Sequence, residues 1–109
     1  MSKQLQFEYE GRKYTLEFTR KTVEMMERQG FVADEAKPKP MTTLPALFAG
    51  AFLANHRFVK PEVIDAIYAK MPNKGELIGK LAEMYNEPIM TLMEEPEESE
   101  GNLTWTTSW

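Results

Sequence analysis

Alternating apolar and polar residues near the start of the chain predict a β-hairpin. The alternation runs from Leu5 to Tyr9 and again from Tyr14 to Phe18, on either side of the turn dipeptide Glu10-Gly11. A period of two places the apolar side chains of each strand on one face of a sheet. Because a two-stranded ribbon is marginally stable in water, we expect this face to cover helices or to gain a third strand.

Helical spacing of apolar residues follows the hairpin. Thr19 is a favourable N-cap for a short first helix, which buries Val23 and Met26 and ends before Gly30. The stretch from Val32 to Met41 contains prolines and shows no apolar period, so it predicts an exposed loop.

The second predicted helix is unusually poor in charged residues. It is expected to start at Thr42 or Thr43 and to run through Phe58. Its main apolar face consists of Leu44, Leu47, Phe48, Ala51, Phe52 and Asn55. Small or apolar residues also occupy most of its other positions, and such a helix is normally buried on most sides. We therefore expect it to be the central helix, or one shared with another subunit.

Prolines punctuate the two helices that follow. Pro61 marks the first turn of a third helix, and Pro72 stops it. Asn73 with Glu76 three residues later predicts a capping box at the start of a fourth helix. Pro88 should end or kink that helix, because proline disfavours the helical conformation of the residue before it.

The end of the chain combines an acidic run with a strand pattern. Five acids lie between Glu94 and Glu100, and Leu103, Trp105 and Trp109 then fall on one side of the chain at period two. A single strand cannot satisfy its own backbone, so we expect it to join the hairpin or a neighbouring subunit. The sequence thus predicts one α+β domain over residues 1–93 with about four helices, an acidic spacer over 94–101 and a C-terminal strand over 102–109.

Composition narrows the classes of function. The 109 residues suffice for one core, and the chain has no apolar run of membrane-spanning or signal-peptide length. The net charge is −4, but outside the acidic run the acids and bases nearly balance. No basic stripe is present to neutralise phosphates, so we expect no nucleic-acid binding. Because no apolar run is long enough for a membrane span or a signal peptide, we also expect no membrane association and a cytoplasmic location.

Catalytic and metal-binding patterns are missing from the sequence. Cysteine is absent, and the single histidine, His56, has no partner motif, so we expect it to be packed or exposed at a helix end. The glycines do not form a phosphate-binding loop. We predict no catalytic residue, no cofactor and no metal. The eight methionines are either flexible core residues or an adaptable surface for an apolar helix of another protein.

In its order of motifs, the chain resembles the tail assembly chaperones of long-tailed bacteriophages of Gram-positive hosts. The resemblance covers nearly the whole chain. It is carried by Phe-Glu-Tyr-Glu-Gly-Arg-Lys-Tyr-Thr-Leu-Glu-Phe-Thr-Arg-Lys-Thr-Val from Phe7, Leu-Phe-Ala-Gly-Ala-Phe from Leu47, Ile-Tyr-Ala-Lys-Met-Pro-Asn-Lys from Ile67, Leu-Ala-Glu-Met-Tyr-Asn-Glu-Pro-Ile from Leu81, and Gly-Asn-Leu-Thr-Trp from Gly101.

The resemblance implies a non-enzymatic function in virion assembly. Such a protein binds the tape measure protein, keeps its apolar helical segments from aggregating and helps to recruit the major tail protein. It acts in the cytoplasm of the bacterial host, is absent from the mature virion and is expected to form a homo-oligomer. In many members a ribosomal frameshift also produces a longer form.

The residues themselves suggest where partners or further copies would bind. The candidates are Phe48, Phe52, Leu53, Met90, Met93, Leu103, Trp105 and Trp109. They supply apolar, adaptable contacts or a strand that can pair. Two other interpretations stay open: a small adaptor or regulatory protein that binds one folded partner through its C-terminal strand, and an enzyme subunit that needs a partner's catalytic groups.

Overall fold

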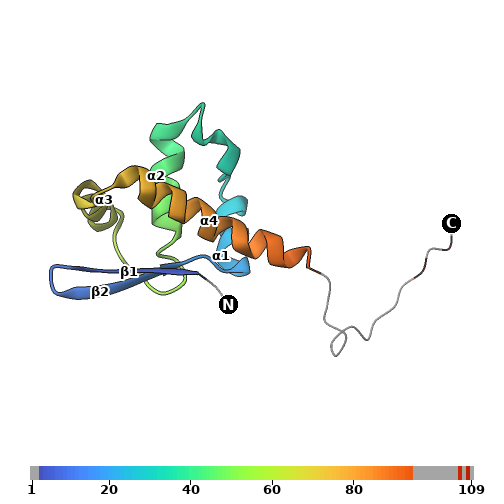
Figure 1. Ribbon diagram of the computed structural model, residues 1–109, viewed down its shortest axis with the longest axis horizontal. Helices are drawn as coiled ribbons and strands as arrows, with labels where there is room; N and C mark the ends of the chain where they lie inside the picture. Colours follow the sequence, from blue (N-terminus) through green and yellow to red (C-terminus); the bar gives the residue numbers. More distant parts are fainter. Residues whose placement is uncertain (1–2, 95–105, 107, 109) are drawn as a thin grey trace.

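The computed structural model describes residues 3–94 together with Thr106 and Ser108. In this part of the chain, four α-helices pack on one face of an antiparallel β-hairpin (Figure 1). The elements are β1 (Gln4–Tyr9), β2 (Arg12–Glu17), α1 (Arg20–Arg28), the 3₁₀ helix η1 (Ala33–Ala36), α2 (Pro40–Gly50), α3 (Pro61–Lys70) and α4 (Lys74–Leu92). The predicted α+β class, with its N-terminal hairpin and four helices, is confirmed. Among the described helices, none has the length and hydropathy that a membrane span requires.

The hairpin closes through a two-residue turn. Glu10 and Gly11 have positive φ angles of 51° and 78°. Two consecutive positive φ angles are typical of a type I′ turn, whose twist matches that of the flanking strands. The rings of Phe7 and Tyr14 lie opposite each other in the register and stack with centroids 5.3 Å apart. The predicted aromatic face is therefore formed, and it faces the helices.

Helix α1 is capped at both ends, as the sequence predicts. The hydroxyl of Thr19 accepts the backbone N–H of Thr22 at 3.1 Å, and the Thr22 hydroxyl accepts the N–H of Thr19 at 2.8 Å. At the other end Gly30 has a φ of 94°, and the N–H of Phe31 donates to the carbonyl of Met26 at 2.9 Å. This backward bond is that of a Schellman motif, and it directs Phe31 onto the core.

The segment between α1 and α2 is more ordered than the sequence predicts. The expected exposed loop contains η1, and α2 begins at Pro40 rather than at Thr42 or Thr43. Proline suits the first helical position because its missing N–H would have no partner there. The periodicity did not reveal this turn, since its side chains are largely exposed.

Helix α2 also ends earlier than predicted, at Gly50 instead of Phe58. The carbonyl of Ala51 accepts the N–H of Glu17 in β2 at 3.1 Å, so it is not used within a helix. Asn55 donates to the carbonyl of Thr15 at 3.2 Å. The chain thus leaves the helix because the backbone and side chains of residues 51–56 bind the edge of β2.

The start of α4 differs from the predicted capping box. Asn73 has a left-handed conformation with φ 53° and ψ 50°, and its side chain makes no cap hydrogen bond. An N-cap side chain normally needs extended backbone to reach the N–H groups of the first turn. Instead, the Lys74 ammonium donates to the carbonyls of Ala69 and Met71 at the end of α3, at 3.2 and 2.8 Å.

Pro88 does not end α4, because the helix continues to Leu92. A proline in a helix removes one hydrogen bond and is normally costly. Here the ring of Pro88 is buried. The guanidinium of Arg20 also donates to the carbonyl of Thr91 at 3.1 Å and fixes the last turn to the start of α1. Tertiary contacts therefore stabilise a helical turn that proline disfavours locally.

One hydrophobic core joins the hairpin and all four helices. The buried apolar side chains are Tyr14, Leu16, Phe18, Val23, Met26, Leu47, Phe48, Ala51, Phe52, Ile64, Ile67, Leu77, Leu81, Met84 and Tyr85. Helix α2 is the central helix, since it contacts α1, η1, α3 and α4. Of the predicted acidic spacer and C-terminal strand, the structure describes only Glu94, Thr106 and Ser108. Thr106 and Ser108 are exposed and do not lie in a strand, and Leu103, Trp105 and Trp109 are outside the described residues.

Candidate protein-binding surface

An apolar groove of about 810 Å³ separates α4 from η1 and the first half of α2. The start of α2 and η1 project away from the hairpin (Figure 1). The apolar residues that line the groove are Phe31, Val32, Ala33, Ala36, Leu44, Leu47, Ile78, Ala82, Tyr85 and Ile89. Helices η1, α2 and α4 and the segment between α1 and η1 therefore contribute to one hydrophobic surface.

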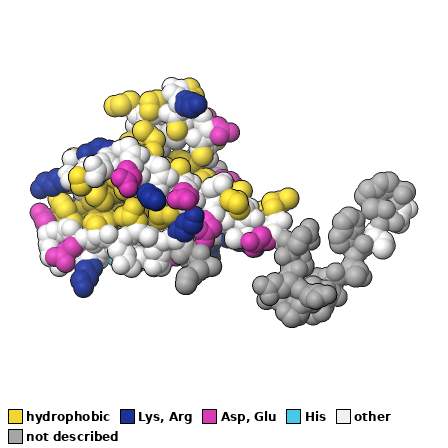
Figure 2. Space-filling model, viewed as in Figure 1, with side chains coloured by type: hydrophobic (Ala, Val, Ile, Leu, Met, Phe, Trp, Pro, Cys, Tyr) yellow, Lys and Arg dark blue, Asp and Glu magenta, His cyan; other side chains and the backbone are white. Residues whose placement is uncertain are grey.

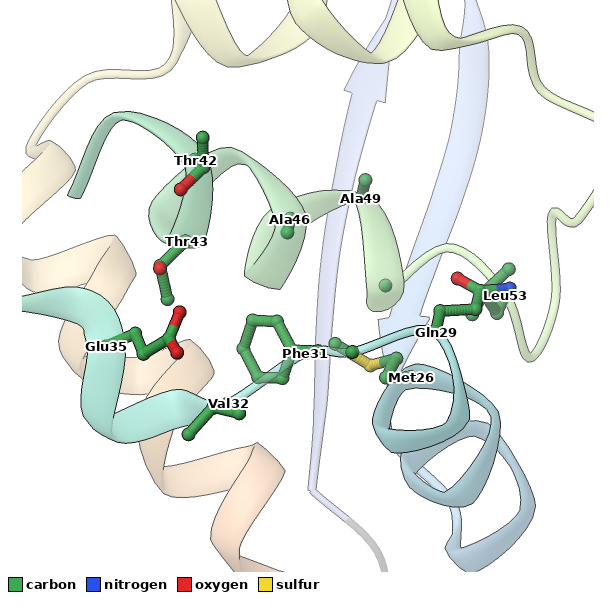
Figure 3. Close-up of a pocket in the computed structure, with 12 residues that line it drawn as sticks. Met26, Gln29, Phe31, Val32, Glu35, Thr42, Thr43, Ala46, Ala49 and Leu53 are labelled. Carbon is green, nitrogen blue, oxygen red and sulfur yellow. The ribbon is translucent and has the colours of Figure 1, made fainter. Parts of the chain in front are cut away.

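A smaller hollow of about 350 Å³ lies on the other side of Phe31 and Val32, between α1, η1 and α2. In Figure 3 the ring of Phe31 lies between Met26 of α1 and Thr43 of α2. Phe31, Val32 and Thr43 line both spaces, so they form the wall between the hollow and the groove. The Schellman motif that ends α1 sets the position of this wall.

The groove continues onto an exposed apolar tip at the end of α4. Ile89 lines the groove and is 38% exposed, and its neighbour Met90 is 63% exposed. Leu92 and Met93 are exposed to 63% and 80%. Figure 2 shows hydrophobic side chains projecting from this end of the helix. We call Ile89, Met90, Leu92 and Met93 the α4 tip. Single exposed apolar residues are common on protein surfaces, but the α4 tip adjoins an apolar groove and so forms a larger apolar surface.

Acidic residues surround the groove. Glu27, Asp34 and Glu83 lie among its lining residues. The Lys3 ammonium lies 3.1 Å from the Glu83 carboxylate and, through its hydrogen bond and charge, holds the pKa of Glu83 below the usual range. The nearby charge of Lys80 acts in the same direction. An acidic rim favours partners that carry lysine or arginine beside their apolar residues.

Burial raises the pKa of the Tyr85 hydroxyl, and the charge of Glu27 adds to this effect. The ring of Tyr85 packs edge-on against Phe18 and Phe31, with both centroid distances at 5.3 Å. Tyr85 therefore joins the core to the floor of the groove and presents a neutral hydroxyl at physiological pH.

The structure places the predicted partner-binding residues in different environments. Phe48 and Phe52 are each 1% exposed and lie in the core, so as placed here they offer no surface to a partner. Leu53 is half-buried and lines the smaller hollow. Met90 and Met93 are exposed at the α4 tip. Helix α2 is buried along one face, through Thr43, Leu47, Phe48 and Gly50. Met41, Pro45 and Ala46 are exposed, so the expectation of a helix buried on most sides is wrong.

Sequence reasoning missed the groove itself. It assigned Leu44 and Leu47 to a helical face, but it did not bring these residues together with Phe31 and Ile89. The signal was available in part, since the Schellman sequence around Gly30 and the apolar residues after Pro88 are both recognisable. What was missing was the continuation of α4 through Pro88.

Within the described residues, no group of three or more histidine, aspartate or glutamate side chains is arranged to hold a metal ion. His56 is half-buried, and its Nε2 accepts the backbone N–H of Thr15 at 3.0 Å. Its surroundings are aromatic, with Tyr14 at a centroid distance of 5.0 Å and Phe52 at 6.4 Å. The single histidine thus has a structural contact.

Residues 1–109, the whole chain, match the model of a protein family described as a domain of unknown function, DUF5055. The chain belongs to this family. No curated protein and no solved structure matches it.

Proposed function

We propose that the chain is a phage tail assembly chaperone, which binds apolar helical segments of the tape measure protein and helps to recruit the major tail protein. The observation that carries the proposal is the groove of about 810 Å³ and its continuation onto the α4 tip. Residues of α2 and η1 face α4 across an apolar groove. This arrangement suits an amphipathic helix that inserts its apolar face.

The chemistry of the α4 tip suits a client with many similar segments. Met90 and Met93 are exposed and unbranched, and methionine side chains adapt to surfaces of different shape. Ile89 and Leu92 add less flexible apolar area beside them. A surface of this kind binds successive apolar helices without requiring one fixed sequence, as protection of a long helical client demands.

Several copies acting together would increase the effect. A tape measure protein offers repeated binding sites along its length, and linked binding events raise the overall affinity without new contacts. The proposal therefore includes a homo-oligomer in the cytoplasm of the bacterial host and release before the virion is complete. The acidic rim around the groove would favour client segments with flanking basic residues.

The test is a binding measurement with two matched substitutions. Ile89→Asp puts a charge in the open groove, and Phe58→Asp puts the same charge at a residue that is 92% exposed and lines a different surface hollow. The probe is a purified amphipathic helical segment of a bacteriophage tape measure protein. We expect Ile89→Asp to weaken binding by about tenfold or more and to abolish protection from aggregation, since a buried charge without a partner is unfavourable.

Phe58→Asp should bind and protect the segment as the unmodified protein does. Equal binding by both variants would place the client elsewhere and overturn the assignment of the groove. If instead the chain stays monomeric and binds one folded protein in a 1:1 complex, with no effect on helical segments, the adaptor function replaces the chaperone.

A further inference from the structure

The hairpin has two edges, and the structure covers one of them. Thr15 and Glu17 direct their backbone groups away from β1, toward residues 51–56. The N–H of Thr15 donates to His56 and its carbonyl accepts from Asn55, at 3.0 and 3.2 Å. The N–H of Glu17 donates to the carbonyl of Ala51 at 3.1 Å. The outer edge of β2 is therefore closed to a further strand over this length.

The edge of β1 is open in the described part of the chain. Gln4, Gln6 and Glu8 lie opposite Glu17, Thr15 and Lys13. In an antiparallel pair, residues opposite each other direct their backbone groups the same way relative to the ribbon, either both inward or both outward. The backbone groups of Thr15 and Glu17 point outward, so the backbone groups of Gln6 and Gln4 opposite them also point outward. Every second residue of a strand points the same way, so the backbone groups of Glu8 point outward too. Within residues 3–94 no hydrogen bond reaches these outer backbone groups.

This edge lacks the usual protection against pairing. Between Gln4 and Tyr9 it contains no proline, no lysine and no bulge, and the register is regular throughout. On the side of the helices, Leu5, Phe7 and Tyr9 are only half-buried. Figure 2 shows hydrophobic side chains at the surface between the hairpin and helices α3 and α4. A strand added here would gain backbone hydrogen bonds and cover apolar side chains at the same time.

The chain leaves α4 close to this edge. Lys3, beside the first residue of β1, forms an ion pair with Glu83 of α4 at 3.1 Å. The last turn of α4 is held by Arg20, which lies just after the end of β2. Nine residues separate Met93 from Leu103. Fully extended they reach roughly 30 Å, and a six-residue strand is about 20 Å long, so either direction of pairing is within reach.

In the structure Thr106 and Ser108 are exposed and lie outside the two-stranded sheet. We propose a further state of the protein, in which Leu103–Trp109 pairs with the open edge of β1 in the same chain and forms a third strand. Leu103, Trp105 and Trp109 share one side of this segment, and that side would face the helices beside Phe7. A short tether gives an effective concentration of about a millimolar. At micromolar protein, the segment of the same chain therefore fills the edge before that of a second copy. The pairing does not depend on what the groove binds.

Amide hydrogen exchange tests the pairing residue by residue. In the full chain we expect the N–H groups of Gln6 and Glu8 to exchange at least about tenfold more slowly than in the double variant Trp105→Ser, Trp109→Ser. Leu5 and Phe7 serve as internal controls, because their backbone groups point inward to β2. Equal exchange of Gln6 and Glu8 in both proteins would overturn the proposal.

A substitution on the strand itself gives an independent measurement. Gln6→Pro removes one outward N–H, which an edge strand tolerates, whereas Gln6→Thr keeps it. We expect Gln6→Pro to free the tryptophans, with a red shift of their fluorescence, and Gln6→Thr to leave the spectrum unchanged. If both spectra match that of the unmodified protein, the segment does not lie on this edge.

Sedimentation separates the same-chain pairing from an exchange between copies. We expect the protection of Glu8 to stay unchanged when the protein is diluted a hundredfold, whether or not the proposed homo-oligomer dissociates. Protection that disappears on dilution together with a dimer would show that a second copy supplies the strand, and it would overturn the assignment to the same chain.

Discussion

The Nε2 atom of His56 accepts a hydrogen bond from the backbone N–H of Thr15 at 3.0 Å. This contact connects the loop after α2 to the edge of β2, and Tyr14 packs against the same imidazole at 5.0 Å. As an acceptor, Nε2 carries no proton in this arrangement. The only histidine of the chain therefore closes a sheet edge, and its role follows from the backbone group that it satisfies.

Replacing His56 by Ala should lower the free energy of unfolding by about 1–3 kcal/mol, because the Thr15 N–H loses its acceptor. His56→Gln retains an acceptor oxygen and should cost less. Urea denaturation of the three proteins measures the difference. Binding of the tape measure segment should be essentially unchanged in His56→Gln. A defined enzymatic reaction lost on that substitution would contradict the non-enzymatic function, and an unaltered His56→Ala curve would contradict the structural role.

Phe52 and Phe58 provide a second prediction, since the two rings are 1% and 92% exposed. Phe52→Asp removes a core ring and buries a charge without a partner, so it should cost on the order of 4 kcal/mol or more. Phe58→Asp should change the unfolding free energy by no more than about 0.5 kcal/mol. Thermal and urea unfolding of both variants compare them directly. If Phe52→Asp had the same melting temperature as the unmodified protein, Phe52 would not be part of the core.

Local signals in the sequence were reliable where one short-range rule applied. The Glu10-Gly11 turn, the Thr19 cap and the Gly30 end of α1 each depend on a few neighbouring residues, and all three are as predicted. The boundaries of α2 were not, because residues 51–56 are fixed by hydrogen bonds to β2, some 40 positions away.

The same reasoning explains the errors in α4 and in the candidate site. Pro88 normally interrupts a helix, but its burial and the Arg20 contact are tertiary effects. Without the continuous α4 the groove has no second wall, so the apolar pattern alone did not place Ile89 in a binding site. Phe48 and Phe52 were recognised as apolar, but periodicity alone does not tell a core face from a binding face.

Tyr85 predicts how stability changes at alkaline pH. Burial raises the pKa of its hydroxyl in the folded protein above the ordinary value of about 10. Between the two values, the unfolded chain ionises while the folded chain keeps its proton. The contribution of the Tyr85 hydroxyl to the free energy of unfolding is thus fully present below about pH 10, and it is lost as the pH rises through the pKa of the folded protein. Tyr85→Phe should flatten the decline in urea stability between pH 9.5 and 11. An identical decline in both proteins would argue against the raised pKa.

The contact between Arg20 and Thr91 links the stability of α4 to binding. The guanidinium donates to the Thr91 carbonyl at 3.1 Å, at an exposed position where a hydrogen bond contributes about 1 kcal/mol. Arg20→Ala should therefore change global stability little. It should, however, let the last turn of α4 fray, since Pro88 already weakens that turn. We expect faster amide exchange at Met90 and Leu92.

The α4 tip would then be less ordered before it binds, and ordering it on binding costs free energy. Affinity for the tape measure segment should fall by several-fold in Arg20→Ala. Lys21→Ala, at the next and exposed position, is the matched control and should alter neither exchange nor affinity. If Arg20→Ala speeds exchange at the tip but binds the segment with unchanged affinity, the tip is not part of the client surface, and the groove alone must carry the proposed binding.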